Sequence, residues 1–324
     1  MTPRGISNPA GRFAPEIIEW LEAPPPAKLS VREDRARSVL VKNTNPRMPF
    51  AWSLNPYRGC THACAYCYAR EYHEYMELGA GTDFERILFT KPDAPALLEA
   101  ALRRRSWRGE RITMSGVTDP YQPIERQHRL TRGCLEVMTR FRNPVGIITR
   151  SPLIVRDLDL LVELAEHGAA QVTFSIPVMD PDLARLLEPG APPPSARLAA
   201  IAALSEAGVP VGVSLAPLIP GLNDAGVPEA LRAARAAGAA WAWTGLVNLP
   251  GSVAAVFEER LRAAAPLRAD GVMARLRRGR DKSWEATEQL FAIWHRKLGF
   301  SAPPVGPCPS PFRRPDPAGQ LTLF

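Results

Sequence analysis

Three of the five cysteines of this chain lie within eight residues, as Cys60, Cys64 and Cys67. Their C-x3-C-x2-C spacing lets one loop place three thiolates around a small inorganic core, and such thiolates hold iron–sulfur clusters. A 4Fe–4S cluster held by three thiolates has one iron without a protein ligand, and an open coordination position is typical of a catalytic metal site. The spacing therefore predicts a three-cysteine 4Fe–4S site whose fourth iron is free to bind a ligand.

A zinc site is the main alternative to the cluster. Structural zinc takes four ligands, and the ring of His62, inside the loop, is poorly placed to complete a tetrahedron. Disulfides are disfavoured because the cysteine count is odd and the N-terminus carries no secretory pattern. Cys134 is expected to be a buried thiol on a helix face, and Cys308 a free thiol in the tail.

An aromatic residue, Tyr66, directly precedes the third cysteine. With it, the motif resembles the signature of radical S-adenosylmethionine (radical SAM) enzymes. The string from Asn55 to Arg70, followed by His-Glu-Tyr at 73–75, resembles their spore photoproduct lyase-like branch, the "DNA repair photolyase" proteins, and the likeness extends over about residues 36–300. It implies that S-adenosylmethionine binds the open iron of a 4Fe–4S cluster and is cleaved by one electron to a 5′-deoxyadenosyl radical.

Short apolar runs alternate with amphipathic segments from Ser38 onward. Strands are predicted at 38–42, 51–55, 86–90, 112–115, 146–149, 171–175, 209–215 and 240–246, and helices at 94–105, 127–142, 156–167, 195–207 and 225–238. Strands that alternate with helices indicate βαβ units and a parallel sheet. The resemblance implies the particular α/β architecture, a partial (β/α)6 TIM-type barrel, with its chemistry at the C-terminal ends of the strands.

Composition divides the chain into three segments. Residues 1–37 are rich in proline, arginine and glycine and are predicted to form a flexible, extended N-terminal arm, with a short helical pattern at 15–22. Residues 38–300 are predicted to form the radical SAM core domain with C-terminal helices. Residues 301–324 form a proline-rich tail, of which 301–319 is expected to be a mobile linker.

Small and polar residues follow several of the predicted strands, and they are candidates for holding the cofactor: Ser115, Gly116, Thr118, Asp119, Arg150 and Ser175. Small residues let the backbone approach a ligand closely, and Arg150 can bind a carboxylate or phosphate through two hydrogen bonds. The resemblance implies that residues 115–119 contact the methionine amino group and that Ser175 lies near the ribose. An ordinary strand-to-helix turn capped by Asp119 is the alternative.

Glu188 and Arg197 lie on either side of a proline-rich loop. This loop resembles a family segment near the cofactor, which implies that the two residues hold the ribose or methionine ends of S-adenosylmethionine. A proline-stiffened turn before a solvated helix start is equally consistent with the sequence.

Two tyrosines, Tyr66 and Tyr68, flank the last cysteine of the motif. The resemblance implies a catalytic role for them, because tyrosines in this position are implicated in radical relay in spore photoproduct lyase. That lyase returns a hydrogen atom to its product from a cysteine in a Ser-Cys-x-x-Asp context. The matching segment here, Ser115–Asp119, carries glycine at the cysteine position. This departure predicts either a tyrosine as hydrogen donor or a different substrate.

The net charge of +7 and the pI near 9.4 are compatible with a nucleic-acid partner without requiring one. Two arginine clusters with interleaved tryptophan, at 103–108 and 275–284, suit phosphate contacts and base stacking, although charged runs are also typical of solvated helix faces. No apolar run is long enough to cross a bilayer. An oxygen-sensitive metal site and few cysteines predict a reducing cytoplasm.

The last five residues resemble the peptide that bacterial proteins insert into the DNA polymerase sliding clamp. Its anchors would be Gln320, Leu321, Leu323 and Phe324, since a few apolar side chains on a tether suffice for such recognition. The alternative is that this apolar C-terminus packs back on the body.

Two classes of function therefore stay open. The first is a radical SAM enzyme, lyase-like or with another radical reaction, that acts on damaged or modified DNA, is recruited by the clamp and receives electrons from a donor such as flavodoxin or ferredoxin. Radical modification of RNA or protein is the alternative within this class. The second class is a non-catalytic accessory protein whose cluster is structural or redox-sensing.

Overall fold

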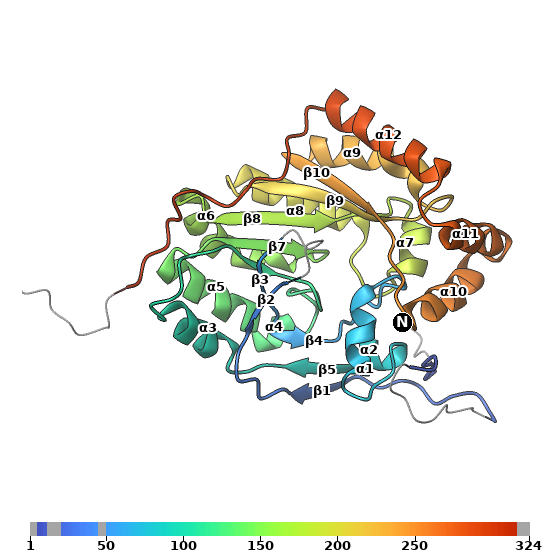
Figure 1. Ribbon diagram of the computed structural model, residues 1–324, viewed down its shortest axis with the longest axis horizontal. Coiled ribbons are helices and arrows are strands. Elements are labelled where there is room, and N and C mark those ends of the chain that lie inside the picture. The colour runs from blue at the N-terminus through green and yellow to red at the C-terminus, as the bar shows by residue number, and fades with distance from the viewer. Residues whose placement is uncertain (1–4, 12–20, 45–49, 316–324) are drawn as a thin grey trace, which may run out of the picture.

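A computed structural model describes residues 5–11, 21–44 and 50–315 (Figure 1). Its strands are β1 (Ser30–Glu33), β2 (Leu40–Lys42), β3 (Trp52–Leu54), β4 (Tyr57–Arg58), β5 (Ile87–Thr90), β6 (Ile112–Met114), β7 (Val145–Thr149), β8 (Ala170–Ser175), β9 (Val211–Leu218) and β10 (Trp241–Leu246). Its helices are α1 (Glu71–Glu74), α2 (Thr82–Arg86), α3 (Ala94–Leu102), α4 (Glu125–His128), α5 (Leu130–Phe141), α6 (Leu158–Glu166), α7 (Pro181–Leu187), α8 (Pro194–Glu206), α9 (Val227–Ala236), α10 (Val253–Ala264), α11 (Pro266–Arg278) and α12 (Lys282–Lys297).

The main sheet has seven strands in the order β10-β9-β8-β7-β6-β3-β2. Strands β3 to β10 of this sheet run parallel, and only β2 is antiparallel to its neighbour. Met114 lies opposite both Leu54 and Ile147, which fixes the register across three strands. Because β10 and β2 form the two edges, the barrel is not closed. The predicted partial (β/α)6 barrel is confirmed.

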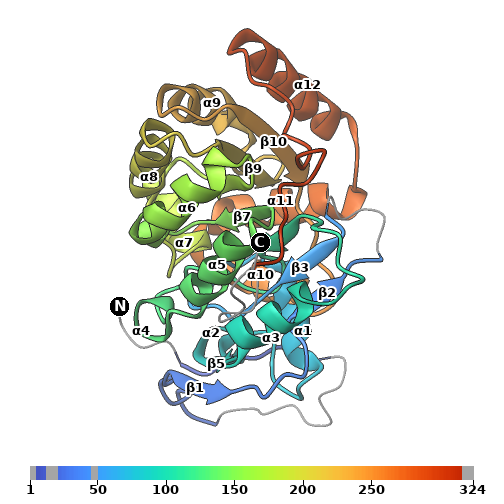
Figure 2. The ribbon, with the colours of Figure 1, turned by 90° about the vertical axis from the view of Figure 1, so that its left-hand side faces the viewer.

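Helices cover the outer face of these strands, as Figure 2 shows for α5, α6, α8 and α9. Helix α5 illustrates why they do so: Leu130, Cys134, Met138 and Phe141 recur at intervals of three or four residues and are all buried. Cys134 therefore packs in the core, as expected, and burial raises the pKa of its thiol. Covering one leucine or phenylalanine in this way stabilises the fold by about 1.5–3 kcal/mol.

A second, three-stranded sheet has the order β1-β5-β4. Strand β1 pairs in parallel with β5, with Ser30 opposite Ile87, so part of the predicted N-terminal arm is sheet rather than free chain. Near the start of the chain, Ser7 N donates to Thr82 Oγ1 at 3.1 Å. The sequence could not show this pairing, because strand β5 is a short apolar run that fits either sheet. The helical pattern at 15–22 lies mostly outside the described residues.

The tail also differs from the expected mobile linker. Residues 301–315 run back along the body, and the ring of Phe312 stacks on Phe141 with centroids 6.2 Å apart. Ser301 N donates to Ala240 O at 3.0 Å, and Arg111 Nη1 donates to Pro304 O at 2.9 Å. The predicted clamp-binding peptide lies outside the described residues. Among the residues described, no helix combines the length and the apolar character needed to span a membrane.

Candidate active site

The cysteine loop begins directly after β4. Gly59 and Ala63 have left-handed torsions, with φ of 72° and 57°, which glycine adopts freely and alanine adopts at a cost of roughly 1–2 kcal/mol. Two tight turns follow, in which Ala63 N donates to Cys60 O at 3.2 Å and Cys67 N donates to Cys64 O at 3.3 Å. With these turns, all three thiol side chains line one cavity.

Buried arginines hold the backbone of this loop from behind. Arg70, which is fully buried, donates from Nε to Cys64 O at 2.9 Å, from Nη1 to two carbonyls before α2, and from Nη2 to Glu85 at 2.7 Å. Arg260 of α10 donates to Ala63 O and to the same Glu85 carboxylate. A loop that is fixed through its carbonyl oxygens keeps its thiols in place.

The proline-rich loop between α7 and α8 packs directly on the cysteine loop. Ala65 N donates to Leu187 O at 2.7 Å, and Gly190 N donates to His62 O at 3.0 Å. A Cβ at Gly190 would lie 1.8 Å from Thr61 O, so only glycine fits this approach. The loop is therefore part of the wall that supports the cysteines.

A cavity of about 310 Å³ lies between the cysteine loop and the C-terminal ends of the barrel strands. Ligand pockets range from about 300 to 1,000 Å³. Its lining comes from the loop and from the ends of successive strands: Cys60, His62, Ala63, Cys64, Tyr66, Cys67, Tyr68, Ala69, Phe84, Ser115, Gly116, Thr118, Asp119, Ile148, Arg150, Ser175, Ser214, Ala216, Pro217, Trp243, Gly245, Leu246 and Asn248.

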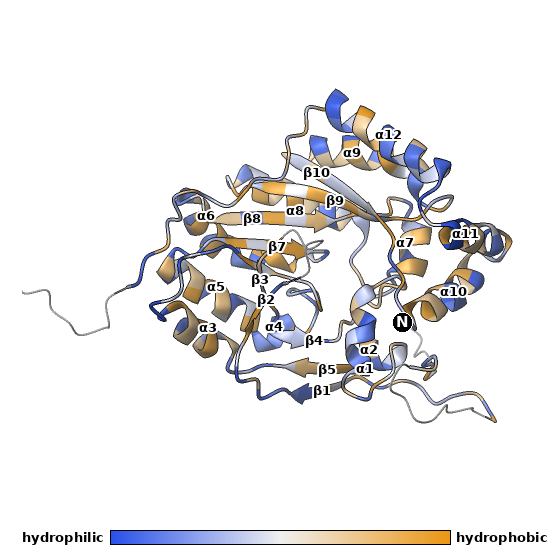
Figure 3. Cartoon of the chain, in the orientation of Figure 1, coloured by the Kyte–Doolittle hydropathy of each residue, from blue (hydrophilic) through white to orange (hydrophobic). Residues whose placement is uncertain are grey.

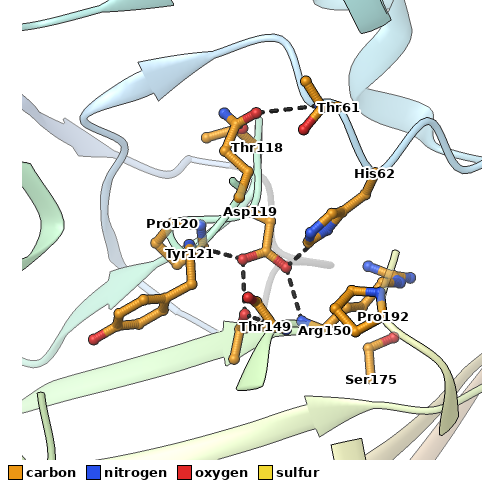
Figure 4. A network of polar contacts seen from close by, with 12 residues as sticks. Thr61, His62, Thr118, Asp119, Pro120, Tyr121, Thr149, Arg150, Ser175 and Pro192 are labelled. Atoms are coloured by element: carbon orange, nitrogen blue, oxygen red, sulfur yellow. Dashed lines mark hydrogen bonds and ion pairs between the residues drawn. The ribbon is translucent and has the colours of Figure 1, made fainter. Parts of the chain in front are cut away.

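Asp119 links three of these elements (Figure 4). Its carboxylate accepts hydrogen bonds from Tyr121 N at 2.9 Å, Thr149 Oγ1 at 2.7 Å and Arg150 N at 2.8 Å. His62 Nδ1 lies 3.3 Å from Oδ2. Burial alone would raise the pKa of Asp119, but His62 and these hydrogen bonds lower it to about 2. The carboxylate thus fastens the end of β6 to the end of β7 and to the cysteine loop.

Thr118 and Gln122 fix the same turn from its other side. Thr118 Oγ1 donates to Gly59 O at 2.6 Å, and Gln122 Nε2 donates to Gly59 O at 3.0 Å and to Thr118 Oγ1 at 2.9 Å. Gln122 Oε1 accepts from Thr61 N at 3.1 Å. Sequence reasoning missed Gln122 and the role of His62, because nothing in the local pattern shows which loop faces this turn.

Glu188 is the centre of a second buried network. Arg150 Nε donates to Oε1 at 3.2 Å, and Arg197 donates to Oε2. The hydroxyl of Tyr66 donates to Oε1. Burial would raise the pKa of Glu188, but the arginines lower it to about 2. The guanidinium of Arg150 also lies over the Tyr66 ring, 5.9 Å from its centroid.

The structure brings most of the predicted site residues to this one cavity. Exceptions are Glu188 and Arg197, which are buried and do not line the space. Glu188 accepts from Arg150 and Tyr66, and Arg197 donates to Glu188. Their predicted contact with the cofactor stays a prediction. Sequence reasoning missed Phe84, Trp243 and Asn248 in the lining, although Trp243 lies within the strand predicted at 240–246.

The cavity fits an iron–sulfur cluster better than a single metal ion. Among the described residues, no three His, Cys, Asp or Glu side chains are arranged to hold one ion. In a 4Fe–4S cluster each thiolate binds a different iron, so the sulfurs need only surround one space. Cys60 and Cys67 pack with Ala69 and Phe84, which gives that space an apolar wall. Arg150 supplies a cation for the negative charge of thiolates and sulfides.

Cys60 and Cys64 are buried, and Cys67 is partly buried. Burial raises the pKa of Cys64 and that of Cys67. For Cys60, burial is the largest effect and acts in the same direction, but the charge of His62, its hydrogen bond to the thiol and a backbone hydrogen bond from Asp119 together outweigh burial and lower the pKa. Ser115 and Ser175 line the opposite side of the space, where polar groups suit a polar cofactor.

Together, the partial barrel, the three-cysteine loop over its strand ends and the polar strand termini define a class of iron–sulfur enzyme with an open cluster site. The profile of the Radical SAM superfamily matches residues 54–234, which is more than half of the chain. The chain belongs to the radical SAM superfamily. The cofactors of this superfamily are a 4Fe–4S cluster and S-adenosylmethionine, and the residues at the cavity fit both.

Several proteins are similar to this chain in sequence. It is 39% identical over 189 residues to the "Uncharacterized protein Rv2578c" of Mycobacterium tuberculosis, an alignment covering 58% of this chain and 56% of that protein. It is 31% identical over 165 residues to the "Uncharacterized protein MJ0683" of Methanocaldococcus jannaschii, covering 50% and 59%. The matches thus span little more than half the length of these relatives.

Solved structures of spore photoproduct lyase share the fold. A mutant with bound AdoMet and dinucleoside spore photoproduct is 17% identical, with a TM-score of 0.52, over 73% of this chain and 67% of that chain. Spore photoproduct lyase complexed with dinucleoside spore photoproduct is 16% identical, with a TM-score of 0.54, over 72% and 67%. At this identity the likeness concerns the fold.

Proposed function

We propose that this protein is a radical SAM enzyme that acts on damaged or modified DNA in the cavity between the cysteine loop and the strand ends. The observation that carries this proposal is that Cys60, Cys64 and Cys67 line one cavity with Ser115, Arg150 and Ser175. The chemistry supplied by the bound cluster and S-adenosylmethionine is one-electron cleavage to a 5′-deoxyadenosyl radical.

The chain itself supplies binding, orientation and shielding. The three cysteines hold the cluster, and the buried arginines behind the loop fix their backbone. Arg150 provides a positive charge at the cavity wall, held by Glu188. Phe84, Leu246 and Trp243 give the cavity apolar surface, which excludes water from a reactive site.

Two observations support DNA as the substrate class. Spore photoproduct lyase, which has the same fold, is seen with dinucleoside spore photoproduct bound. The chain is also basic, with a net charge of +7. Gly116, however, lines the cavity in the segment that matches the hydrogen-donating cysteine of the lyase. We therefore propose a lesion or modification other than the spore photoproduct, with a tyrosine as hydrogen donor.

Product analysis under anaerobic conditions tests the enzyme proposal. Reconstituted protein given dithionite and S-adenosylmethionine is expected to release 5′-deoxyadenosine. Cys64→Ala should abolish this release, whereas Cys134→Ala, which removes a core thiol remote from the cavity, should retain it. An intact cluster that yields no 5′-deoxyadenosine would refute the proposal.

Substrate class is tested separately, with irradiated duplex DNA, RNA and a protein extract. A change of mass in the DNA that depends on S-adenosylmethionine is expected. Change in RNA or protein alone would move the substrate to one of those classes without affecting the radical chemistry.

We further propose that the last residues recruit the protein to the sliding clamp and that flavodoxin or ferredoxin reduces the cluster. Deletion of Gln320–Phe324 should abolish binding to purified clamp in surface plasmon resonance and leave 5′-deoxyadenosine release unchanged. Equal clamp binding by the full and shortened chains would reject the recruitment proposal.

A further inference from the structure

Arginines from two distant segments meet at the end of the barrel opposite the cysteine loop. Arg104, Arg105 and Arg108 lie in the loop that leads from α3 into the start of β6, and Arg313 and Arg314 lie in the tail. All five side chains are exposed. Arg314 Nη2 joins the two segments by donating to Arg104 O at 2.9 Å and to the neighbouring Trp107 O at 2.7 Å. These five arginines are called the basic surface below.

Specific contacts dock the tail at this place. Phe312 stacks on Phe141, with an angle of 18° between the rings, and Arg313 N donates to Phe141 O at 2.8 Å. Ser310 Oγ donates to Gly109 O at 2.7 Å. A Cβ at Gly109 would lie 2.3 Å from the Cβ of Phe312, so glycine is needed for the tail to come this close. In Figure 3 the hydrophilic tail and the loop after α3 lie at the same left-hand end of the molecule.

The charges of the basic surface are not neutralised by carboxylates in the part of the chain that the structure describes. Glu99 binds Arg103 and Arg140, which are not part of this surface. Glu110 accepts a hydrogen bond from the backbone N of Arg108 rather than from its guanidinium. Exposed arginines on two segments that touch each other give this end of the barrel a positive charge, which attracts an anionic partner.

The second arginine cluster of the sequence, at the end of α11, is different. Arg277 pairs with Glu258 at 4.0 Å, Arg278 with Asp281 at 3.1 Å, and Arg280 with Glu288 at 3.0 Å. These charges are therefore balanced within the chain, and the α11 cluster serves as a matched control.

We propose that the basic surface binds the phosphate backbone of duplex DNA, independently of its sequence. Arginine suits this partner because its planar group binds phosphate oxygens through two hydrogen bonds. Base stacking is excluded for Trp107, which is only 6% exposed and donates from its indole N to Asn143 at 2.8 Å. The surface therefore contacts backbone rather than bases.

This inference rests on the proposed DNA substrate and gives the enzyme a second contact with it, remote from the cavity. A second contact raises the local concentration of DNA at the protein without adding any selectivity for a lesion. The basic surface would keep undamaged duplex bound while different nucleotides enter the cavity.

Fluorescence anisotropy with an undamaged duplex of about 30 base pairs, titrated with the anaerobically reconstituted full chain at several salt concentrations, tests the proposal. The variant Arg104→Ala/Arg105→Ala/Arg108→Ala should weaken binding by at least about tenfold and reduce the slope of log K against log salt by about 2–3. The variant Arg313→Ala/Arg314→Ala should also weaken binding. Phe312→Ala changes no charge but releases the tail from Phe141, and it should weaken binding to a similar extent.

The charge-matched control Arg277→Ala/Arg278→Ala/Arg280→Ala should change affinity by less than about twofold, since those arginines are already paired. Melting temperatures show whether each variant is folded. Equal affinity and equal salt slope for duplex DNA in wild type and both arginine variants of the basic surface would overturn the proposal. So would a loss of affinity that these variants show only in a parallel titration with double-stranded RNA. The anisotropy experiment measures binding and not turnover. A failure of the DNA substrate proposal would therefore be seen in a different experiment, as unaltered DNA in the product analysis.

Discussion

Arg150 Nε donates to Glu188 Oε1 at 3.2 Å, and this pair joins the wall of the cavity to the buried network behind it. Arg197 binds the other carboxylate oxygen, so one acidic group lies between two basic ones. The carboxylate is fully buried, and the Arg150 side chain is 20% exposed. Glu188 therefore determines where the charge of Arg150 lies.

Replacing Glu188 with glutamine should destabilise the fold strongly. Removing one partner of a buried ion pair leaves an uncompensated charge and costs about 3–5 kcal/mol. The measurement is the free energy of unfolding in urea. Glu258→Gln is the matched control, because Glu258 forms partly exposed pairs with Arg262 and Arg277, and such pairs contribute about 0–1 kcal/mol each. Equal losses for the two variants would contradict the structural role of Glu188.

Arg150 should also set the reduction potential of the cluster. Its charge lies close enough to Cys64 and Cys67 to interact with both. A unit charge about 10 Å away, at an effective dielectric constant of about 20, contributes about 1.7 kcal/mol, or about 70 mV for one electron. Arg150→Gln should therefore shift the potential by about that amount to more negative values in an EPR-monitored titration, whereas Arg150→Lys should shift it much less. Equal potentials for Gln and wild type would contradict this assignment.

The two tyrosines beside Cys67 should respond differently to removal of their hydroxyls. Tyr66 is 4% exposed and donates to Glu188, so Tyr66→Phe should mainly lower stability, by about 1 kcal/mol. Tyr68 lines the cavity and is 41% exposed. If Tyr68 returns the hydrogen atom, Tyr68→Phe should lower the yield of the product formed from the substrate at least about tenfold, while 5′-deoxyadenosine is still released. Unchanged product yield would exclude Tyr68 as donor.

The repeat of strands and helices and the cluster motif could be predicted from the sequence because both are local patterns. Val145–Thr149 and Ala170–Ser175, for example, were predicted within one residue, since each is an apolar run between amphipathic helices. The loop spacing alone placed the three cysteines together.

Contacts between distant segments could not be predicted in this way. Strand β1 pairs with β5 across more than fifty residues, and Phe312 reaches Phe141 from the tail. Glu188 is predicted to hold the cofactor because its loop resembles a cofactor-binding segment. The sequence does not show that its partners in the chain come from α8, the end of β7 and the cysteine loop. A single sequence does not show which polar side chains face a cavity and which lie behind its wall.

Gly116 is required by the backbone rather than by space. Its φ is +115°, which is strained for any L-residue, yet a Cβ placed there would meet nothing within 4 Å. Gly116→Ala should therefore cost about 1–3 kcal/mol in unfolding free energy through backbone strain alone. Gly226 is the control, because its φ is −78° and a Cβ there also meets nothing. A loss at Gly116 no larger than that at Gly226 would show that the turn relaxes.

His73 should make stability depend on pH near neutrality. Its ring lies against Phe84 and Phe89, with Nε2 2.9 Å from Ile87 O, and burial lowers its pKa below the usual 6.5. Below pH 6.5 the unfolded chain therefore binds a proton that the folded chain does not. The stability that His73 contributes is complete above pH 6.5 and is lost as pH falls towards the folded pKa.

The slope for one such proton is at most about 1.4 kcal/mol per pH unit. Urea unfolding at pH 7.5, 6.5 and 5.5 should show a fall in stability for wild type that is reduced in His73→Gln. The glutamine amide can still donate to the Ile87 carbonyl but does not titrate in this range. Parallel pH profiles for the two proteins would mean that the folded ring accepts its proton as readily as the unfolded one.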